Sequence, residues 1–319
     1  MSIKRNNIGL WLGLFGGILW GVDTVLIGVI LEQPILSLTF FLLPLVVTFL
    51  HDAFSSLWML LYILISGKMS FLKTTFKNKA LHFVVIAGLF GGPIGMTGYL
   101  MAIYYIGPSY TAIISATYPA IGALLSVIFL KEKLTFKMMI GLSMAIGATM
   151  LLGFSSTDPI NNLMLGFFFA LLCAVGWGAE SVVSAYGMDN NIIPTIALYL
   201  RQTTSAVIFA VVIMPMIGGY EIVNVIINHS IIYYIALTAL AGTTSYMFYY
   251  TSIHYIGPIK AMGLNISYSA WAIVISLIIG FNISFQEFIL AFMIVAGSLL
   301  TTNKPSEFFK LFKVSRKEI

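Results

Sequence analysis

Long apolar segments separated by short polar breaks repeat along the whole chain. A helix that crosses about 30 Å of hydrocarbon needs roughly 20 apolar residues, and ten segments come close to or exceed that length. They cover residues 8–31, 39–66, 82–106, 109–130, 134–153, 162–187, 192–217, 231–256, 258–280 and 284–302. The pattern predicts an all-α polytopic membrane protein with ten transmembrane helices.

Charge is too sparse for a surface that faces water. Only 8% of the 319 residues are charged, whereas soluble proteins carry about 25%. Most of the surface must therefore face lipid. This excludes a soluble enzyme, a nucleic-acid binder and a disordered scaffold, and the formal net charge of +5 is explained by membrane topology without a nucleic-acid partner.

All of the 16 Lys and Arg residues except Arg201 gather at alternate loops and at both ends of the chain. They are Lys4, Arg5, Lys68, Lys73, Lys77, Lys79, Lys131, Lys133, Lys137, Lys260, Lys304, Lys310, Lys313, Arg316 and Lys317. The opposite loops carry Glu32, Asp158, Glu221 and Glu287 and no Lys or Arg. Cytoplasmic loops of membrane proteins are enriched in Lys and Arg, so both termini are predicted to be cytoplasmic.

The two halves of the chain share ordered motifs. Residues 20–25 read WGVDTV and residues 177–182 read WGAESV, 157 positions later. The sequence YIGP occurs at 105–108 and again at 255–258, 150 positions later. On that second offset Ser115 matches Asn265, and Tyr118 matches Tyr268. These matches predict a duplicated five-helix unit, with repeats at 1–153 and 154–303 and a basic cytoplasmic tail at 304–319.

Five is an odd number, so the second repeat would be inverted in the membrane relative to the first. Inverted repeats are typical of secondary transporters, whose substrate site lies near the midplane between the repeats. A channel or a membrane enzyme could also be duplicated, but a transporter is favoured. The sequence contains no G-x-x-x-x-G-K-[ST] loop, which argues against an ATP-driven pump.

Aromatic and acidic residues lie together near the middle of two spans. Trp20 and Asp23 are three residues apart, as are Trp177 and Glu180, so each pair shares one helical face. Membrane tryptophans usually lie at the interface with water, which suits Trp11 better than these two. We expect both pairs to contribute to a site.

The duplication adds further candidates to this site. Tyr118 and Tyr268 occupy equivalent positions in the two repeats, and Asn265 shares a face with Tyr268. Because aromatic residues make up 14% of the chain, we expect the other tyrosines, such as Tyr99 and Tyr246, to be packing residues.

The predicted interior carries excess negative charge. Asp23, Asp52 and Glu180 are acidic, Arg201 is basic, and His51 adds a titratable group. Unpaired buried charge costs several kcal/mol per ion, so a proton or a bound cation is needed. We expect Arg201 to pair with Asp52 or Asp23, which leaves two acids.

The composition of the site favours an organic cation. Trp and Tyr faces beside a carboxylate bind quaternary ammonium groups, whereas an inorganic cation needs a shell of oxygen ligands. The four histidines form no metal-spaced motif with Cys173, the single cysteine, so neither a metal nor a disulfide is expected.

These motifs resemble the drug/metabolite transporter superfamily of the EamA type over residues 8–302. Five stretches are similar to the Lic-type bacterial choline permeases: GPIGM at 92–96, SATYPA at 115–120, WGAESV at 177–182, RQTTS at 201–205 and GLNISY at 263–268. The resemblance implies a plasma-membrane permease that imports choline, coupled to protons and without a cofactor. It also implies a choline site lined by Trp20, Tyr118, Trp177, Glu180, Asn265 and Tyr268.

The remaining buried ionisable groups form a predicted network for proton coupling: Asp23, His51, Asp52 and Arg201. Glu180, one turn after Trp177, is the carboxylate for which we expect choline and a proton to compete. Asp23 is the alternative, and His51 with Asp52 is the next candidate.

Two other functions stay open. An exporter of an amino acid or another small metabolite would need Arg201 free to bind a substrate carboxylate. A receptor or a lipid-handling scaffold would not need two inverted copies of a polar midplane site. The oligomeric state is also open.

The first prediction concerns topology. Because the basic residues mark the cytoplasmic side, a cysteine added after Ile319 should react with a membrane-impermeant reagent only once the membrane is opened. A cysteine at Asp158, in a predicted outer loop, is the matched control and should react in intact cells. Labelling of the C-terminal cysteine in intact cells would contradict the topology and the inverted repeat.

Overall fold

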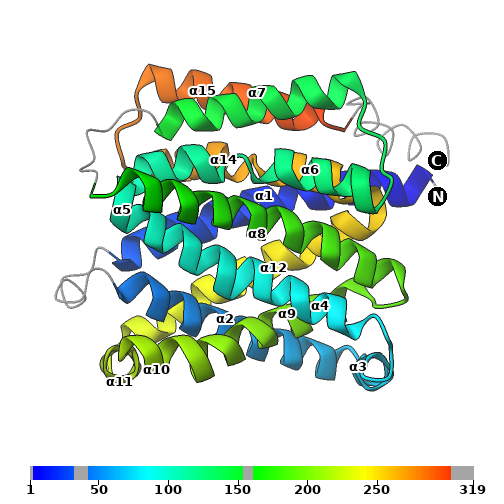
Figure 1. The fold of residues 1–319 in the computed structure, drawn as a ribbon, viewed down its shortest axis with the longest axis vertical. Helices are drawn as coiled ribbons and strands as arrows, with labels where there is room; N and C mark the ends of the chain where they lie inside the picture. Colours follow the sequence, from blue (N-terminus) through cyan, green and yellow to red (C-terminus); the bar gives the residue numbers. More distant parts are fainter. Residues whose placement is uncertain (1–2, 32–41, 154–160, 303–319) are drawn as a thin grey trace, which may run out of the picture.

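The structure is a computed structural model that describes residues 3–31, 42–153 and 161–302. The regular elements within these ranges are all helical (Figure 1). The predicted tail at 304–319, Glu32, Asp158 and the proposed boundary at 153/154 involve residues outside this part of the chain.

The helices follow the predicted spans closely. They are α1 (Ile3–Leu31), α2 (Leu43–Ile65), α3 (Met69–Thr75), α4 (Leu81–Leu89), η2 (Phe90–Ile94), α5 (Gly95–Ser115), α6 (Tyr118–Phe129), α7 (Phe136–Gly153), α8 (Leu163–Asp189), α9 (Pro194–Ile208), η3 (Phe209–Ile213), α10 (Met214–Ile217), α11 (Tyr220–Ile227), α12 (Ile231–Ile256), α13 (Pro258–Asn265), α14 (Tyr268–Ile279) and α15 (Phe285–Leu300).

Nine helical stretches in the described ranges are long and apolar enough to cross a membrane. The last predicted span coincides with α15, an apolar helix of 16 residues, which is shorter than the roughly 20 residues of a typical span. The protein is therefore an all-helical polytopic membrane protein. Ten crossings and cytoplasmic termini stay predictions.

Two of the predicted spans are interrupted near their middle. One breaks between Ser115 and Tyr118, where α5 gives way to α6, and the other breaks between α13 and α14. At each break a hydroxyl bonds a nearby backbone carbonyl: Thr117 donates to Ile114 at 2.7 Å and Ser267 donates to Leu264 at 2.6 Å. Broken helices persist in membranes when such groups satisfy the freed backbone.

Two wider helical turns were not predicted from the sequence. The π-helical segment η2 contains Pro93, and η3 lies shortly before Pro215. Proline lacks a backbone N–H and clashes with the preceding turn, and a local π turn is a common way for a helix to accommodate such a disturbance. The two segments lie in the third and the seventh predicted spans, which are not equivalent positions of the two halves.

The two YIGP motifs form the same backbone turn. Gly107 has φ 78° and ψ 164°, and Gly257 has φ 84° and ψ 156°. Side chains disfavour this positive-φ region, whereas glycine enters it readily. The motif therefore reverses the chain sharply between two consecutive long helices in each half.

The helices pack in extended pairs. The largest contacts join α1 with α12, α5 with α8, α7 with α15 and α2 with α9. Figure 1 shows α7 and α15 side by side at one end of the molecule and α2, α9 and α10 toward the other, with α1, α5, α8 and α12 between them. The central four helices and α2 and α9 are thus in position to surround an interior site.

Small residues allow the α1–α12 pair to approach closely. Ser245 Oγ donates to the Gly16 carbonyl at 2.8 Å, and Ser252 Oγ donates to the Gly9 carbonyl at 2.9 Å. Small residues and interhelical hydroxyl bonds are the usual means of helix association in lipid.

The second prediction concerns the Gly257 turn. Gly257→Ala should lower the free energy of unfolding by about 1–3 kcal/mol, because its φ is positive and the new Cβ would collide with the Glu132 carboxylate. Thermal unfolding of the purified protein in detergent measures the change.

Gly28→Ala is the matched control. Gly28 is exposed within α1 and has no other atom within 4 Å of an added Cβ, so the change should be neutral or stabilise by roughly 0.5–1 kcal/mol. Equal unfolding temperatures for the two variants would contradict the assigned turn.

Candidate functional site

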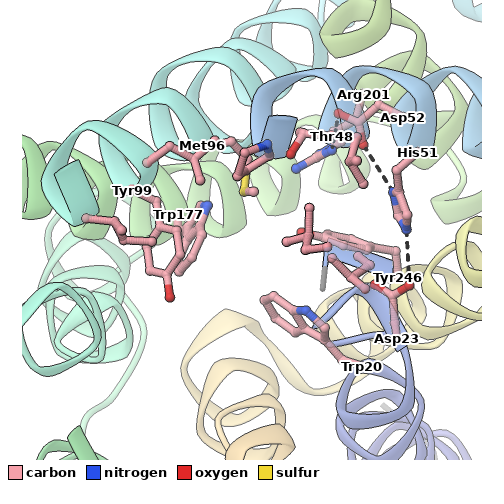
Figure 2. A pocket seen from close by; sticks show the side chains of 16 residues that line it. Trp20, Asp23, Thr48, His51, Asp52, Met96, Tyr99, Trp177, Arg201 and Tyr246 are labelled. Atoms are coloured by element: carbon pink, nitrogen blue, oxygen red, sulfur yellow. Dashed lines mark hydrogen bonds and ion pairs between the residues drawn. The ribbon is translucent and has the colours of Figure 1, made fainter. Parts of the chain in front are cut away.

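A cavity of about 260 Å³ lies between α1, α2, α5, α8, α9 and α12 (Figure 2). Its polar and aromatic lining consists of Trp20, Asp23, Thr48, His51, Asp52, Met96, Tyr99, Trp177, Arg201 and Tyr246. Apolar residues continue the lining toward Leu31 and Pro44. These two residues lie at the ends of α1 and α2 that the predicted topology places outside the cytoplasm.

Two tryptophans from equivalent motifs face each other in this region. The ring centroids of Trp20 and Trp177 are 6.4 Å apart, with planes at 71°. Tyr268 stacks on Trp20 at 4.7 Å, and Tyr118 meets Trp177 edge-on at 5.9 Å. Each tryptophan is therefore held by a tyrosine from the opposite half of the chain.

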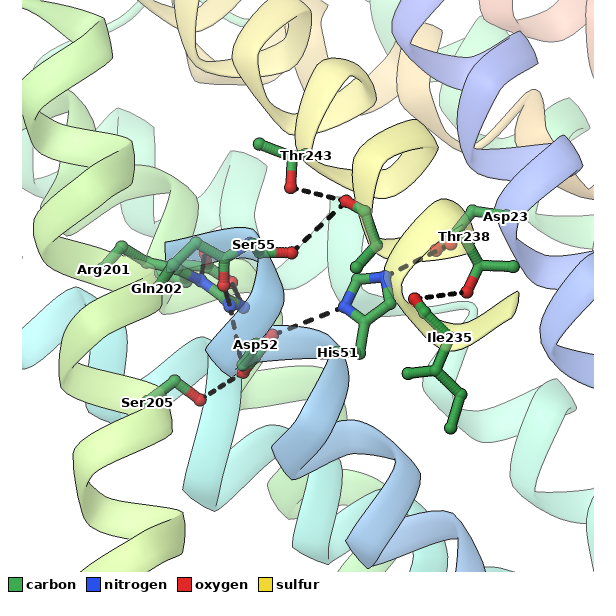
Figure 3. A network of polar contacts seen from close by, with 12 residues as sticks. Asp23, His51, Asp52, Ser55, Arg201, Gln202, Ser205, Ile235, Thr238 and Thr243 are labelled. Atoms are coloured by element: carbon green, nitrogen blue, oxygen red, sulfur yellow. Dashed lines mark hydrogen bonds and ion pairs between the residues drawn. The ribbon is translucent and has the colours of Figure 1, made fainter. Parts of the chain in front are cut away.

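His51 connects two carboxylates at the polar side of the cavity. Its Nε2 lies 3.2 Å from Asp23 Oδ1, and its Nδ1 lies 3.7 Å from Asp52 Oδ1. All three residues are at least 92% buried. Figure 3 shows the imidazole between the two acids, with Arg201 and Ser205 beyond Asp52.

Arg201 contacts Glu180 and also Asp52 in the same interior. Its Nε donates to Glu180 Oε1 at 2.7 Å, and its Nη1 lies 3.6 Å from Asp52 Oδ2. Tyr250 donates its hydroxyl to Glu180 Oε1 at 3.0 Å, and the guanidinium carbon lies 4.9 Å from the centre of the Tyr246 ring. Arg201 is 2% exposed and Glu180 is 4% exposed, so this ion pair is almost fully removed from solvent.

This arrangement corrects the predicted partner of Arg201. We expected Asp52 or Asp23, and Asp52 is present only as the longer contact, whereas Glu180 is the closer partner. Glu180 follows Trp177 by one turn, and its carboxylate lies where a Cβ on Gly91 would be. The glycine opens the space through which Glu180 reaches Arg201.

The structure brings some of the predicted binding residues to the cavity and places others behind it. Trp20 and Trp177 line the wall, as do the predicted coupling residues Asp23, His51, Asp52 and Arg201. Tyr118, Glu180, Asn265 and Tyr268 are not among the described residues that line it.

Asn265 lies behind the aromatic wall. Its Nδ2 donates to the Tyr118 hydroxyl at 3.4 Å, while its Oδ1 is buried and has no protein hydrogen-bond partner within the described ranges. Tyr118 and Tyr268 thus contact the tryptophans, and Asn265 contacts Tyr118.

Four of the lining residues labelled in Figure 2, Thr48, Met96, Tyr99 and Tyr246, were not predicted as part of a site. Tyr99 and Tyr246 were expected to pack, and Met96 was not considered. Met96 and Tyr246 are 150 positions apart, so the repeat offset relates them. That repeat offset was the sequence signal that could have identified Met96 and Tyr246 as a matched pair. Thr48 has no such signal, and its position follows only from how α2 packs.

No group of three or more His, Cys, Asp or Glu side chains within residues 3–31, 42–153 and 161–302 is arranged to hold a metal ion. The cavity instead combines flat aromatic faces with an acid that an incoming molecule could contact. This combination suits a small organic cation.

The fold and its central polar cavity define a membrane protein built around a solute-sized site. The sequence matches the EamA-like transporter family twice, over residues 7–154 and 164–303. The chain belongs to that family, and its members are transporters.

A curated relative and a solved structure are among the proteins that are similar to this chain. Protein LicB of Haemophilus influenzae is 35% identical over 188 residues, which are 59% of this chain and 63% of LicB. A solved crystal structure superimposes with a TM-score of 0.69 at 17% identity, covering 92% of this chain and 97% of the other. The aligned part spans less than two thirds of LicB, and the crystal structure shares the fold.

The third prediction concerns the Arg201–Glu180 pair. Arg201→Gln should lower the free energy of unfolding by about 3–5 kcal/mol, because it leaves Glu180 and Asp52 without their cation. Adding Glu180→Gln should recover part of this loss. Thermal unfolding of both variants in detergent measures the coupling.

Lys73→Gln is the control, since Lys73 is exposed on α3 and surface changes usually stay within about 0.5 kcal/mol. The ion-pair account is wrong if Arg201→Gln unfolds no more easily than Lys73→Gln.

Proposed function

We propose that this protein is a plasma-membrane transporter that imports choline, coupled to protons, by alternating access around the cavity. The observation that carries the proposal is the joint presence of Trp20, Trp177 and Asp23 in the lining of one cavity. Flat aromatic faces attract a quaternary ammonium group, and the carboxylate compensates its charge.

The packing supports two inverted repeats. In a duplicated chain, the first span corresponds to the sixth and the eighth span to the third. The contact between α1 and α12, the first and eighth predicted spans, therefore corresponds to a contact between α8 and α5, the sixth and third. These are the two largest contacts in the structure. The matched turns at Gly107 and Gly257 and the matched helix breaks follow the same correspondence.

The size and charge of the cavity support a small cation. Its volume of about 260 Å³ lies just below the roughly 300–1,000 Å³ of pockets for drug-sized ligands. Three acids, one arginine and one histidine are buried in and beside it. The cluster carries net negative charge whether or not His51 is protonated, so a bound monovalent cation reduces the cost of burying it.

The choice of choline rests on the resemblance of five motifs to Lic-type choline permeases. The similarity to LicB supports the choice of choline. Several residues of those motifs also surround the cavity. Trp177 is part of WGAESV, Met96 of GPIGM and Arg201 of RQTTS.

The chemistry of Arg201 argues against the rival substrate. An amino acid would need a free cation for its carboxylate, but Glu180 and Asp52 already occupy Arg201. A cationic solute needs no such group. The same cavity can therefore accept choline without breaking the buried ion pair.

The fourth prediction tests the aromatic wall. Trp20→Leu or Trp177→Leu should weaken choline binding roughly 2- to 30-fold, which corresponds to about 0.5–2 kcal/mol for a cation–π contact. Phe at either position should retain more affinity than Leu, because it keeps an aromatic face. Isothermal titration of the purified protein with choline measures the affinities.

Trp11→Leu is the control: Trp11 stacks on Phe15 at 5.7 Å and is not part of the described cavity lining. Its choline affinity should equal that of the wild type. If the Trp20→Leu and Trp177→Leu variants both bind choline as tightly as the wild type, the proposed aromatic site is contradicted.

A further inference from the structure

Two acid–base pairs occupy equivalent places in the two halves of the chain. Asp23 and Glu180 are the acids of the matched W-G motifs, and His51 and Arg201 are 150 positions apart. The structure joins Asp23 to His51 at 3.2 Å and Glu180 to Arg201 at 2.7 Å. Each half therefore pairs an acid of its first helix with a base of its second.

The two pairs differ in chemistry. Arginine stays charged at every accessible pH, whereas histidine is the side chain whose charge normally changes between pH 5 and pH 8. The pair in the second half is permanent, and the pair in the first half exists as an ion pair only while His51 is protonated.

The two acids also differ in how firmly they are held. Glu180 accepts hydrogen bonds from Arg201 Nε and Nη2 and from the Tyr250 hydroxyl. Within the described part of the chain, His51 supplies the one hydrogen bond to the Asp23 carboxylate. Releasing Asp23 therefore breaks one contact, while releasing Glu180 breaks three.

The two acids also differ in whether they line the cavity. Asp23 and His51 line it. Glu180 is enclosed between Arg201 and Gly91. A cation in the cavity can reach the first acid without displacing the second pair.

We infer that a cation entering the cavity takes Asp23 from His51, and that His51 then releases its proton, while the Glu180–Arg201 pair stays intact. The Nε2–H bond of the imidazolium breaks, its electrons stay on the ring, and the proton passes to water. This inference rests on the proposed function, because it names the proton site of the same cavity.

Among the described residues around His51, none besides it is of a type that normally titrates between pH 5 and pH 8. Around it are Asp23 on α1, Asp52 on α2, Glu180 on α8, Arg201 on α9 and Tyr246 on α12. The helices α5 and α11, which also contact α2, add Tyr99 and the exposed Glu221. The proton released on cation binding is therefore assigned to His51.

The fifth prediction is a pH profile of choline affinity. In the wild type, the affinity should rise from pH 5 to pH 8, by up to about tenfold per pH unit if one proton leaves per choline bound. The reason is that protonated His51 holds Asp23 and repels the cation. His51→Gln should bind choline with an affinity that no longer changes over this range.

His82→Gln is the matched control, since His82 is exposed on α4; it should keep the wild-type slope. His51→Asn serves as the second variant if His51→Gln does not fold. Calorimetry of the wild type in two buffers with different ionisation enthalpies should also show proton release on choline binding at pH 6.

The possible results separate the two proposals. Choline binding with the wild-type slope in the His51 variants, or no proton release by the wild type, overturns this inference and leaves the choline site standing. Absence of choline binding by the wild type at every pH overturns the proposed function and the inference with it.

Discussion

The burial of three carboxylates inside a lipid-embedded helix bundle constrains the whole interior of this protein. Ionised groups at this depth are costly unless they are paired. Asp52 connects the two pairs, because it lies within 3.6 Å of Arg201 and 3.7 Å of His51. The helices α1, α2, α8 and α9 must therefore converge for each acid to have a basic partner.

In the aromatic wall, too, contacts join the two halves of the chain. Trp20 rests on Tyr268, and Trp177 meets Tyr118, so each tryptophan is fixed by a helix of the opposite repeat. Both tyrosines begin the second part of a broken helix, α6 and α14. A movement of one half against the other would displace each tyrosine relative to the tryptophan that it contacts, and so change the cavity itself.

The matched motifs of the two halves form two similar half-sites, and a few sequence differences give them different chemistry. His51 and Arg201 occupy equivalent positions in the two halves. The histidine is a titratable cation, whereas the arginine is a permanent one. The permanent pair stabilises the packing of α8 against α9. The titratable pair lines the cavity, where a solute can disturb it at the cost of a single hydrogen bond.

Much of the fold and part of the candidate site could be predicted from the sequence, because the relevant signals are periodic. Hydropathy located the helices to within a few residues, and their positions in the middle of a span singled out Trp20 and Trp177, which line the cavity. The partner of Arg201 could not be predicted, since three acids lie at similar depth and only helix packing selects among them. Gly91 decides the choice by leaving room for the Glu180 carboxylate, and a lone glycine in a chain with 28 glycines carries no such signal.

The most direct test of the account is uptake of labelled choline into liposomes that contain the purified protein, with and without a pH gradient. The account predicts uptake above that of protein-free liposomes, competition by unlabelled choline, and a rate that changes when the pH gradient is imposed or collapsed. Uptake no greater than in protein-free liposomes, under either condition, would contradict it.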